Sequence, residues 1–207
     1  MAPGKDSKAT SEQIAAAALG LLERQGPEAV TMREVAKTVG ITPMAIYHHF
    51  PNREALLKTV TDAEFDKLRI LIEAIRHQGS ARPRAQLKEM IMSYADYALA
   101  QPRLFDYVFS RPRPDARRFP EDFRARRSPT LSLFADVVAE AMRAGKLKND
   151  DVWEVTFALW AHVHGYVMLY LGGRFDLSEE EFRQLCGRSV TRFMDGIKAK
   201  KAGKGTA

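Results

Sequence analysis

The chain has 207 residues, 45% hydrophobic and 28% charged, a balance typical of a soluble globular protein with one large or two small domains. No run approaches the ~18 apolar residues of a spanning helix, no signal-peptide-type apolar segment follows the N-terminus, and the single cysteine, Cys186, excludes an internal disulfide and a multi-cysteine metal site. The net charge of +6 weakly favours a polyanionic partner, and the expected compartment is the cytoplasm.

An arm and one helix are expected at the N-terminus. Residues 1–9 are expected to form a mobile arm, which is either an untidy terminus or a basic extension that contacts DNA. Residues 11–25 are predicted to be helical, because apolar residues recur at helical spacing from Ile14 to Leu22. The dipeptide Gly26-Pro27 is expected to end this helix.

The next segment, residues 31–50, is predicted to contain two short helices joined by a tight turn. Thr31 is an N-cap candidate with Glu34 three residues later, which is the capping-box pattern. Gly40 follows the apolar positions of this first helix and supplies a residue that ends a helix with a positive φ.

The second short helix is expected to begin after Thr42, another N-cap candidate. Pro43 then occupies the first helical position, where its missing N–H group costs nothing. Ile46 and Phe50 are four residues apart and share a face that can pack on the preceding helix. Two capped helices around a glycine turn favour a helix-turn-helix motif, although an ordinary helical hairpin has the same pattern.

Asn52 is expected to cap a long helix that runs toward His77 and spans about 35–40 Å. With this helix in place, TMREVAKTVGITPMAIYHHFPNREALL resembles the N-terminal domain of the TetR family of bacterial transcription regulators. The resemblance covers about residues 11–60. It includes Gly26, the TMRE run, Gly40, the YHHF segment and the NREALL start of the long helix.

The resemblance implies that the helix beginning at Thr42 enters the major groove of double-stranded DNA by its N-terminal end. The DNA-contacting residues that it implies are Thr31, Arg33, Thr42, Pro43, Met44, Ala45, Tyr47, His48, His49 and Arg53. Thr31 suits a phosphate, and the planar fork of Arg33 suits a guanine edge or a phosphate.

The remaining positions differ in what they offer to DNA. Met44 and Ala45 lack strong hydrogen-bonding side chains, as does Pro43, so base reading there would depend on thymine methyl groups and groove shape. Tyr47, His48 and Arg53 match phosphate-contacting positions, although Tyr47 also suits packing. His49 is either a DNA contact or a structural hydrogen-bonding group.

Helical patterns continue to the C-terminus, with no strand and no internal repeat. Helices are expected over residues 85–100, 102–109, 128–143, from a cap at Asn149 or Asp150 to 171, and from the Ser178–Glu181 capping box to about 198. Residues 111–127 hold three prolines and seven arginines and are expected to be an irregular loop. This loop is either a solvated surface or a second nucleic-acid patch.

The predicted fold is therefore all-α, with nine helices in the order of the family. A three-helix helix-turn-helix domain, residues 8–68, would precede a six-helix ligand-binding and dimerisation domain, residues 69–198, and a flexible tail, residues 199–207. The last two helices are expected to form the four-helix bundle of a homodimer. The apolar positions expected there are Val152, Val155, Leu159, Val163, Val167 and Leu171 on one helix and Phe182, Leu185, Val190, Phe193 and Ile197 on the other.

Residues 158–169 resemble the W…HG pattern of one subgroup of TetR-like C-terminal domains. His162 and His164 diverge by about 200° on a helix, so they cannot hold one metal together, and no metal or cofactor is expected. His164 is either a core or interface histidine or part of a ligand pocket. The pocket candidates are Tyr94, Tyr97, Phe105, Phe109, Phe134, Trp160, His164 and Met168, a spacing that also suits plain core.

These features favour a homodimeric repressor that binds a palindromic operator and responds to an unidentified small-molecule effector, without a membrane partner. One alternative is an enzyme on a helical bundle using His164, but metal-ligand spacing, a nucleophile motif and a phosphate loop are missing, so no catalytic residue is assigned. The other is a charge-driven, non-specific DNA binder that uses residues 111–127 and the lysine-rich tail.

Overall fold

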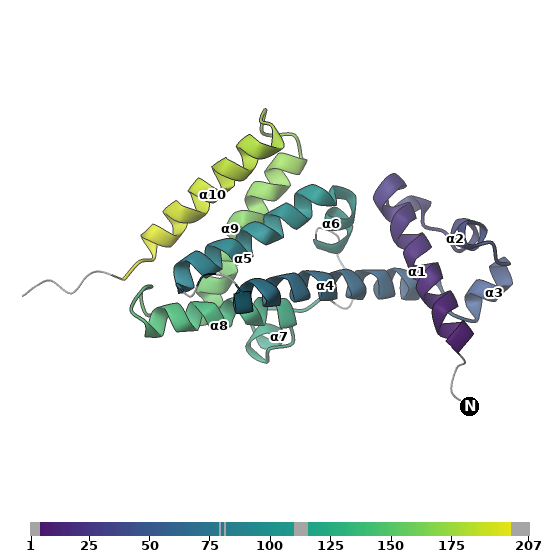
Figure 1. Cartoon of the computed structure of the whole chain (residues 1–207), viewed down its shortest axis with the longest axis horizontal. Helices are drawn as coiled ribbons and strands as arrows, with labels where there is room; N and C mark the ends of the chain where they lie inside the picture. The colour runs from purple at the N-terminus through teal and green to yellow at the C-terminus, as the bar shows by residue number, and fades with distance from the viewer. Residues whose placement is uncertain (1–4, 79, 81, 110–115, 200–207) are drawn as a thin grey trace, which may run out of the picture. The chain divides into compact units, whose positions relative to one another are not determined.

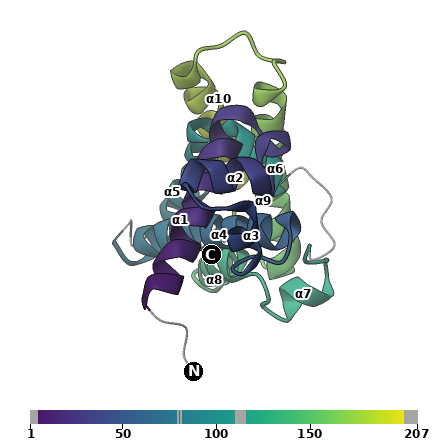
Figure 2. The ribbon, with the colours of Figure 1, turned by 90° about the vertical axis from the view of Figure 1, so that its right-hand side faces the viewer.

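The computed structural model describes residues 5–78, 80, 82–109 and 116–199, with side chains from residue 10 onward (Figure 1 and Figure 2). These residues form ten α-helices and one 3-10 helix, and their only β-type pairing is an isolated bridge between Leu147 and Lys198. The all-α prediction is confirmed. None of the described helices is both long and apolar enough to cross a membrane.

The chain folds as two compact units. The described residues of 1–67 and 101–112 form the first unit, and those of 68–100 and 113–207 form the second. The division within the long helix therefore falls beside the boundary expected after residue 68. The return of residues 101–112 to the first unit was not expected, because those residues follow a helix of the second unit.

The first unit contains α1 (Lys5–Gln25), η1 (Pro27–Ala29), α2 (Met32–Val39), α3 (Pro43–Tyr47), the beginning of α4 (Arg53–Gln78) and α6 (Pro102–Phe109). Figure 2 turns α1, α2 and α3 toward the viewer. The helix α1 starts at Lys5, so residues 5–9 are helical rather than part of the expected arm, and residues 1–4 lie outside the described chain. The main core cluster of this unit contains the buried apolar side chains Ile14, Ala18, Leu21, Leu22, Val30, Met32, Val35, Ala36, Ile46, Phe50, Leu56, Leu57, Val60, Leu104 and Val108.

Caps fix the ends of α2 as predicted. The Thr31 hydroxyl accepts a hydrogen bond from the Glu34 N–H at 3.1 Å. The Glu34 carboxylate instead lies 3.7 Å from the ammonium of Lys37, an exposed pair, so only the Thr31 half of the expected capping box forms. Gly40 has φ 79° and ψ 28°, and its N–H group bonds the Ala36 carbonyl. The turn between α2 and α3 therefore depends on this left-handed residue.

The second unit contains the end of α4, α5 (Pro83–Ala100), α7 (Glu121–Arg124), α8 (Pro129–Arg143), α9 (Val152–Leu171) and α10 (Glu179–Gly196). The helix α5 packs against α8, α9 and α10, and α9 also packs against its two neighbours α8 and α10 (Figure 1). The short helix α7 lies in the segment expected to be irregular, which raises the count from nine to ten; residues 111–115 of that segment lie outside the described chain.

The predicted N-cap is correct for α10 and wrong for α9. The capping box of Ser178 and Glu181 is complete. Asp151, rather than Asn149 or Asp150, caps α9, because its carboxylate accepts hydrogen bonds from the N–H groups of Trp153 at 2.9 Å and Glu154 at 3.0 Å. The last helix ends at Gly196, close to the predicted end.

The apolar faces assigned to a dimer interface are buried mainly inside one chain. Val163 and Val167 of α9 are 0% exposed, and so are Phe182 and Val190 of α10. These side chains pack within the second unit, so they do not face a second chain as expected. The half-buried members of the set, Val152, Leu171, Leu185, Phe193 and Ile197, stay a prediction. Any surface left for a partner must lie outside the buried side chains of these helices.

Replacing Gly40 tests the turn that joins α2 to α3. We expect Gly40→Ala to lower the free energy of unfolding by about 1 kcal/mol or more, because a Cβ atom disfavours the left-handed conformation. A Cβ there has no neighbour within 4 Å, so the loss reports backbone strain alone. Gly40→Asn should cost less, because asparagine tolerates this conformation. Urea denaturation measures both, and equal stability of the alanine variant and the native chain would contradict the assignment.

Candidate nucleic-acid interface

The helix α3 has one buried side and one exposed side. Ile46 is 0% exposed and Phe50 7% exposed, and both lie in the core of the first unit. On the other side, Met44 is 71% exposed and Tyr47 49% exposed. A side chain as apolar as Met44 left in water at the start of a capped helix is the kind of group that contacts thymine methyls in a groove.

The N-terminus of α3 is fixed by its cap. The Thr42 hydroxyl accepts a hydrogen bond from the Ala45 N–H at 3.2 Å, and Pro43 stands at the first helical position, as predicted. Thr42 and Pro43 are exposed, whereas Ala45 is half-buried. The start of α3 is therefore accessible to DNA, as the prediction requires. The Thr42 hydroxyl, however, already accepts the hydrogen bond of the helix cap.

Exposed polar groups flank this helix start. Thr31 and Arg33 are exposed at the beginning of α2, and His48 is exposed directly after α3. Within the described chain, Arg33 makes no recorded hydrogen bond or ion pair. Its guanidinium is thus available to a phosphate or a guanine edge at no cost in internal contacts.

Arg53 is tied into the first unit by two hydrogen bonds. Its Nε donates to the Val30 carbonyl at 2.6 Å, and its Nη2 donates to the Pro27 carbonyl at 2.5 Å. The half-buried guanidinium therefore holds the chain around η1 against the start of α4. A phosphate contact, which the sequence predicts for Arg53, would have to use the donors that remain.

His49 also has an internal partner. Its Nδ1 lies 2.9 Å from the Ser11 hydroxyl, and the imidazole is half-buried. Of the two alternatives for His49, this geometry favours the structural one, because the bond connects the end of α3 to α1. The sequence alone does not reveal this bond, since its partners are 38 residues apart.

The ligand candidates fall into both units. Tyr94, Trp160 and His164 come together in the second unit: the Tyr94 hydroxyl lies 2.9 Å from Nδ1 of His164, and the rings of Trp160 and His164 are 5.6 Å apart. Burial raises the pKa of Tyr94 and lowers the pKa of His164. Both side chains are therefore neutral at physiological pH and form a polar pair among aromatic rings.

The other candidates do not all join this pair. Phe134 is buried in the second unit, and Tyr97 and Met168 are half-buried there. Phe105 and Phe109 belong to α6 in the first unit, where their rings are 4.8 Å apart and Phe109 meets Phe65 at 5.3 Å.

Three phenylalanines that extend the ring cluster from Trp160 were missed. The Phe157 ring lies 5.6 Å from Trp160, 4.6 Å from Phe123 and 4.8 Å from Phe119. Phe157 precedes Trp160 by three residues on α9, and that spacing was a usable signal. Phe119 and Phe123 border or belong to α7, which the proline- and arginine-rich composition concealed. No cluster of three or more potential metal ligands exists in the described ranges.

Two family models match the chain. One, described as "Bacterial regulatory proteins, tetR family", matches residues 14–60, and the other, "Tetracyclin repressor-like, C-terminal domain", matches residues 87–193. An uncharacterized HTH-type transcriptional regulator of Mycobacterium tuberculosis is 27% identical over 172 residues, which cover 83% of this chain and 75% of that protein.

Solved structures share the fold. A TetR-family regulator structure from Mesorhizobium loti has a TM-score of 0.72 at 17% identity and covers 95% of this chain and 100% of its own. The structure of RolR in complex with the ligand resorcinol has a TM-score of 0.64 at 13% identity, over 93% of this chain and 89% of that one.

Replacing Arg53 separates an internal role from a purely DNA-contacting one. We expect Arg53→Lys to lower the free energy of unfolding by about 1–3 kcal/mol, because an ammonium does not reproduce the two-pronged bonding to the Pro27 and Val30 carbonyls. Arg33→Lys is the matched control and should leave stability unchanged. Thermal or urea denaturation without DNA measures both. Equal stability of the two variants would remove the internal role from Arg53.

Proposed function

The chain belongs to the tetR family of bacterial regulatory proteins, and from this premise we propose that it is a ligand-responsive repressor that binds a palindromic operator as a homodimer. Membership makes it a transcriptional regulator with a helix-turn-helix DNA-binding domain. The observation that carries the proposal is the exposure of the capped helix α3. Its start and the side that carries Met44 and Tyr47 are exposed, while its opposite side is buried. A helix held in this way presents a fixed surface to the major groove.

Sequence preference would come from two kinds of contact. Arg33 has a free planar fork that suits a guanine edge, and Met44 offers an apolar contact for a thymine methyl. Thr31, Tyr47 and His48 are exposed around them and suit phosphates. Pro43, Met44 and Ala45 at the start of α3 lack strong hydrogen-bonding side chains, which implies that groove shape contributes to specificity.

Homodimerisation is supported by an outward stripe on α9. Ala158, Ala161 and Leu169 are exposed, and Leu169 is 49% exposed. Gly165 lies on the same stripe, and a Cβ atom there would meet nothing within 4 Å. Small residues around an unoccupied position permit close helix approach by a second chain. Two copies of α3 would then read two half-sites, as one short helix reads too few bases to find a site in a genome.

Ligand responsiveness is supported by the ring cluster of the second unit. Tyr94 and His164 supply a neutral hydrogen-bonding pair, Trp160 lies beside His164, and Phe157 and Phe123 extend the apolar rings from Trp160. The structure of RolR, which is similar in fold, was solved in complex with the ligand resorcinol, and this supports a small-molecule site in the present chain. Binding that changed operator affinity would correspond to a coupling free energy of ~1–3 kcal/mol between the two sites.

The charge-driven alternative is weakened by ion pairs in the arginine-rich segment. Arg124 pairs with Asp151 at 2.9 Å, Arg126 with Asp136 at 2.9 Å, and Arg127 with an acid of its own segment at 2.7 Å. Arginines already paired with carboxylates bind phosphates less strongly, because the new contact replaces an existing one. These three arginines are thus less available to a polyanion than their exposure suggests.

Selection of genomic fragments by the purified protein tests the proposed operator. At about 0.15 M salt we expect one inverted repeat, with half-sites about 10 base pairs apart or a multiple of that spacing. Arg33→Ala should weaken binding to this site by ~1–3 kcal/mol. Arg143→Ala, an equal charge change at an exposed position of the second unit, is the control and should bind as the native chain does. Unrelated fragments retained equally by both variants would contradict the proposal.

The proposed dimer surface is tested by placing a charge on the α9 stripe. Leu169→Glu should convert the dimer into a monomer in sedimentation experiments and weaken operator binding, because two buried carboxylates would face each other across the interface. Ile70→Glu is the matched control, since Ile70 is a 57% exposed apolar residue of α4. A Leu169→Glu protein that remains dimeric would move the interface to another surface.

A further inference from the structure

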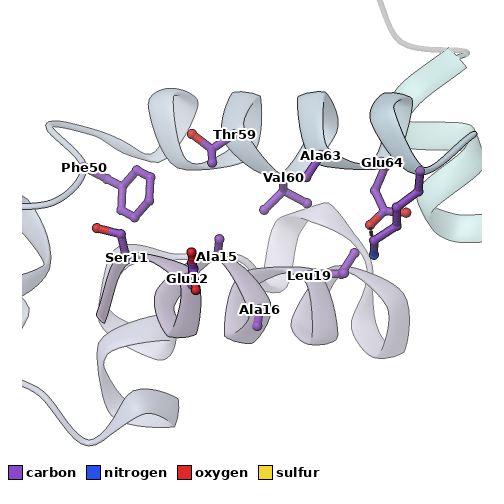
Figure 3. A pocket seen from close by; sticks show the side chains of 11 residues that line it. Ser11, Glu12, Ala15, Ala16, Leu19, Phe50, Thr59, Val60, Ala63 and Glu64 are labelled. Atoms are coloured by element: carbon purple, nitrogen blue, oxygen red, sulfur yellow. Dashed lines mark hydrogen bonds and ion pairs between the residues drawn. The ribbon is translucent and has the colours of Figure 1, made fainter. Parts of the chain in front are cut away.

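A groove of about 470 Å³ runs between α1 and α4 within the first unit (Figure 3). Phe50 and Ser11 lie at one end of it, and Glu64 lies at the other. Lys67 also lines the groove and pairs with Glu64. Its volume is in the range of sites that hold small molecules. It is separate from the ring cluster of the second unit, which the proposed effector would use.

The middle of the groove is apolar and wide because the residues facing it are small. Ala15 and Ala16 of α1 and Ala63 of α4 line it, together with Leu19 and Val60. Short side chains on both helices leave room between them that larger residues would fill. The middle therefore suits an alkyl or compact ring body rather than a polar one.

A buried carboxylate stands at the end of this apolar channel. Glu64 is 1% exposed and lines the groove, and its Oε1 lies 2.5 Å from the Lys67 ammonium. A buried carboxylate is stable only with a cationic or hydrogen-bonding partner. The Lys67 side chain is 60% exposed, so its ammonium can turn into water while the fixed carboxylate keeps its place.

We propose that this groove binds a small organic cation, with an ammonium group that replaces Lys67 at Glu64 and an apolar body that extends past Ala63 and Val60 toward Phe50. The charges of the lining favour a cation over an anion. Glu12 adds an exposed carboxylate, so the residues that line the groove include two carboxylates and one ammonium. The exchange of one ammonium for another preserves the ion pair, and burial of the apolar body supplies the gain.

The position of the groove gives its occupant access to the DNA-binding helix. Phe50 closes one end and lies three residues after the last residue of α3. Ser11, at the same end, bonds His49 at 2.9 Å. Both groups that hold the end of α3 against α1 are thus groove residues. An occupant that moves either of them changes the presentation of α3 directly, within the first unit.

Titration of the full chain without DNA tests the site independently of any operator. We choose n-octylamine as the probe, with 1-octanol and octanoate as neutral and anionic probes of equal length. Octylamine should give saturable amide shifts in residues 11–19 and 59–67 by nuclear magnetic resonance, and it should bind at least ~10-fold more tightly than octanol or octanoate. Equal affinities of the three probes, or shifts confined to the second unit, would overturn the proposal.

Three variants identify the groups responsible. Glu64→Gln should reduce octylamine affinity at least ~10-fold and leave octanol affinity nearly unchanged, whereas Glu54→Gln, on the exposed side of the same helix, should change neither. Lys67→Met removes the competing ammonium and should increase octylamine affinity several-fold. Ala63→Leu fills the channel at an exposed position and should abolish octylamine binding. If Glu64→Gln fails to fold, this loss and the increase in affinity of Lys67→Met test the proposal. Octylamine binding unaffected by Lys67→Met and Ala63→Leu would overturn the assignment.

Discussion

A helix of five residues cannot persist alone in water, and this constraint governs the DNA-binding unit. The helix α3 exists because its two ends are fixed and its inner side is buried. Thr42 and Pro43 hold the start, and Ile46, with Phe50 just beyond the helix, supplies the buried side. The rest of the unit, from α1 to the first turns of α4, forms the core against which α3 is held.

Because α3 needs this support, two residues that were expected to contact DNA make hydrogen bonds inside the unit. Arg53 bonds two carbonyls beside η1, and His49 bonds Ser11, so each keeps a loop or helix end in place beneath the exposed surface. Arg33 and Met44, by contrast, are exposed and do not hold the core together, so both are available to DNA. In the second unit the Arg76 guanidinium bonds Glu140 at 2.8 Å and so fastens the end of α4 to α8.

Local signals predicted local structure well, and they failed where partners are distant in the sequence. The caps at Thr31, Thr42 and Ser178 and the left-handed Gly40 were readable because each interaction spans three or four residues. The carbonyl bonds of Arg53 join residues 23 and 26 positions apart, which no local pattern encodes. Apolar spacing on α9 and α10 identified buried faces correctly but could not say which chain buries them, because periodicity carries no information about the partner.

The measurement that tests the account most directly is an amide-shift titration of the labelled full chain with a selected operator fragment, with a scrambled duplex of equal length and charge as the control. The account predicts operator-specific shifts at residues 31–33 and 42–48, and weak, salt-sensitive shifts with the scrambled duplex. Equal shifts with both duplexes, centred on the arginines of residues 116–127, would show that charge rather than the helix-turn-helix surface binds DNA.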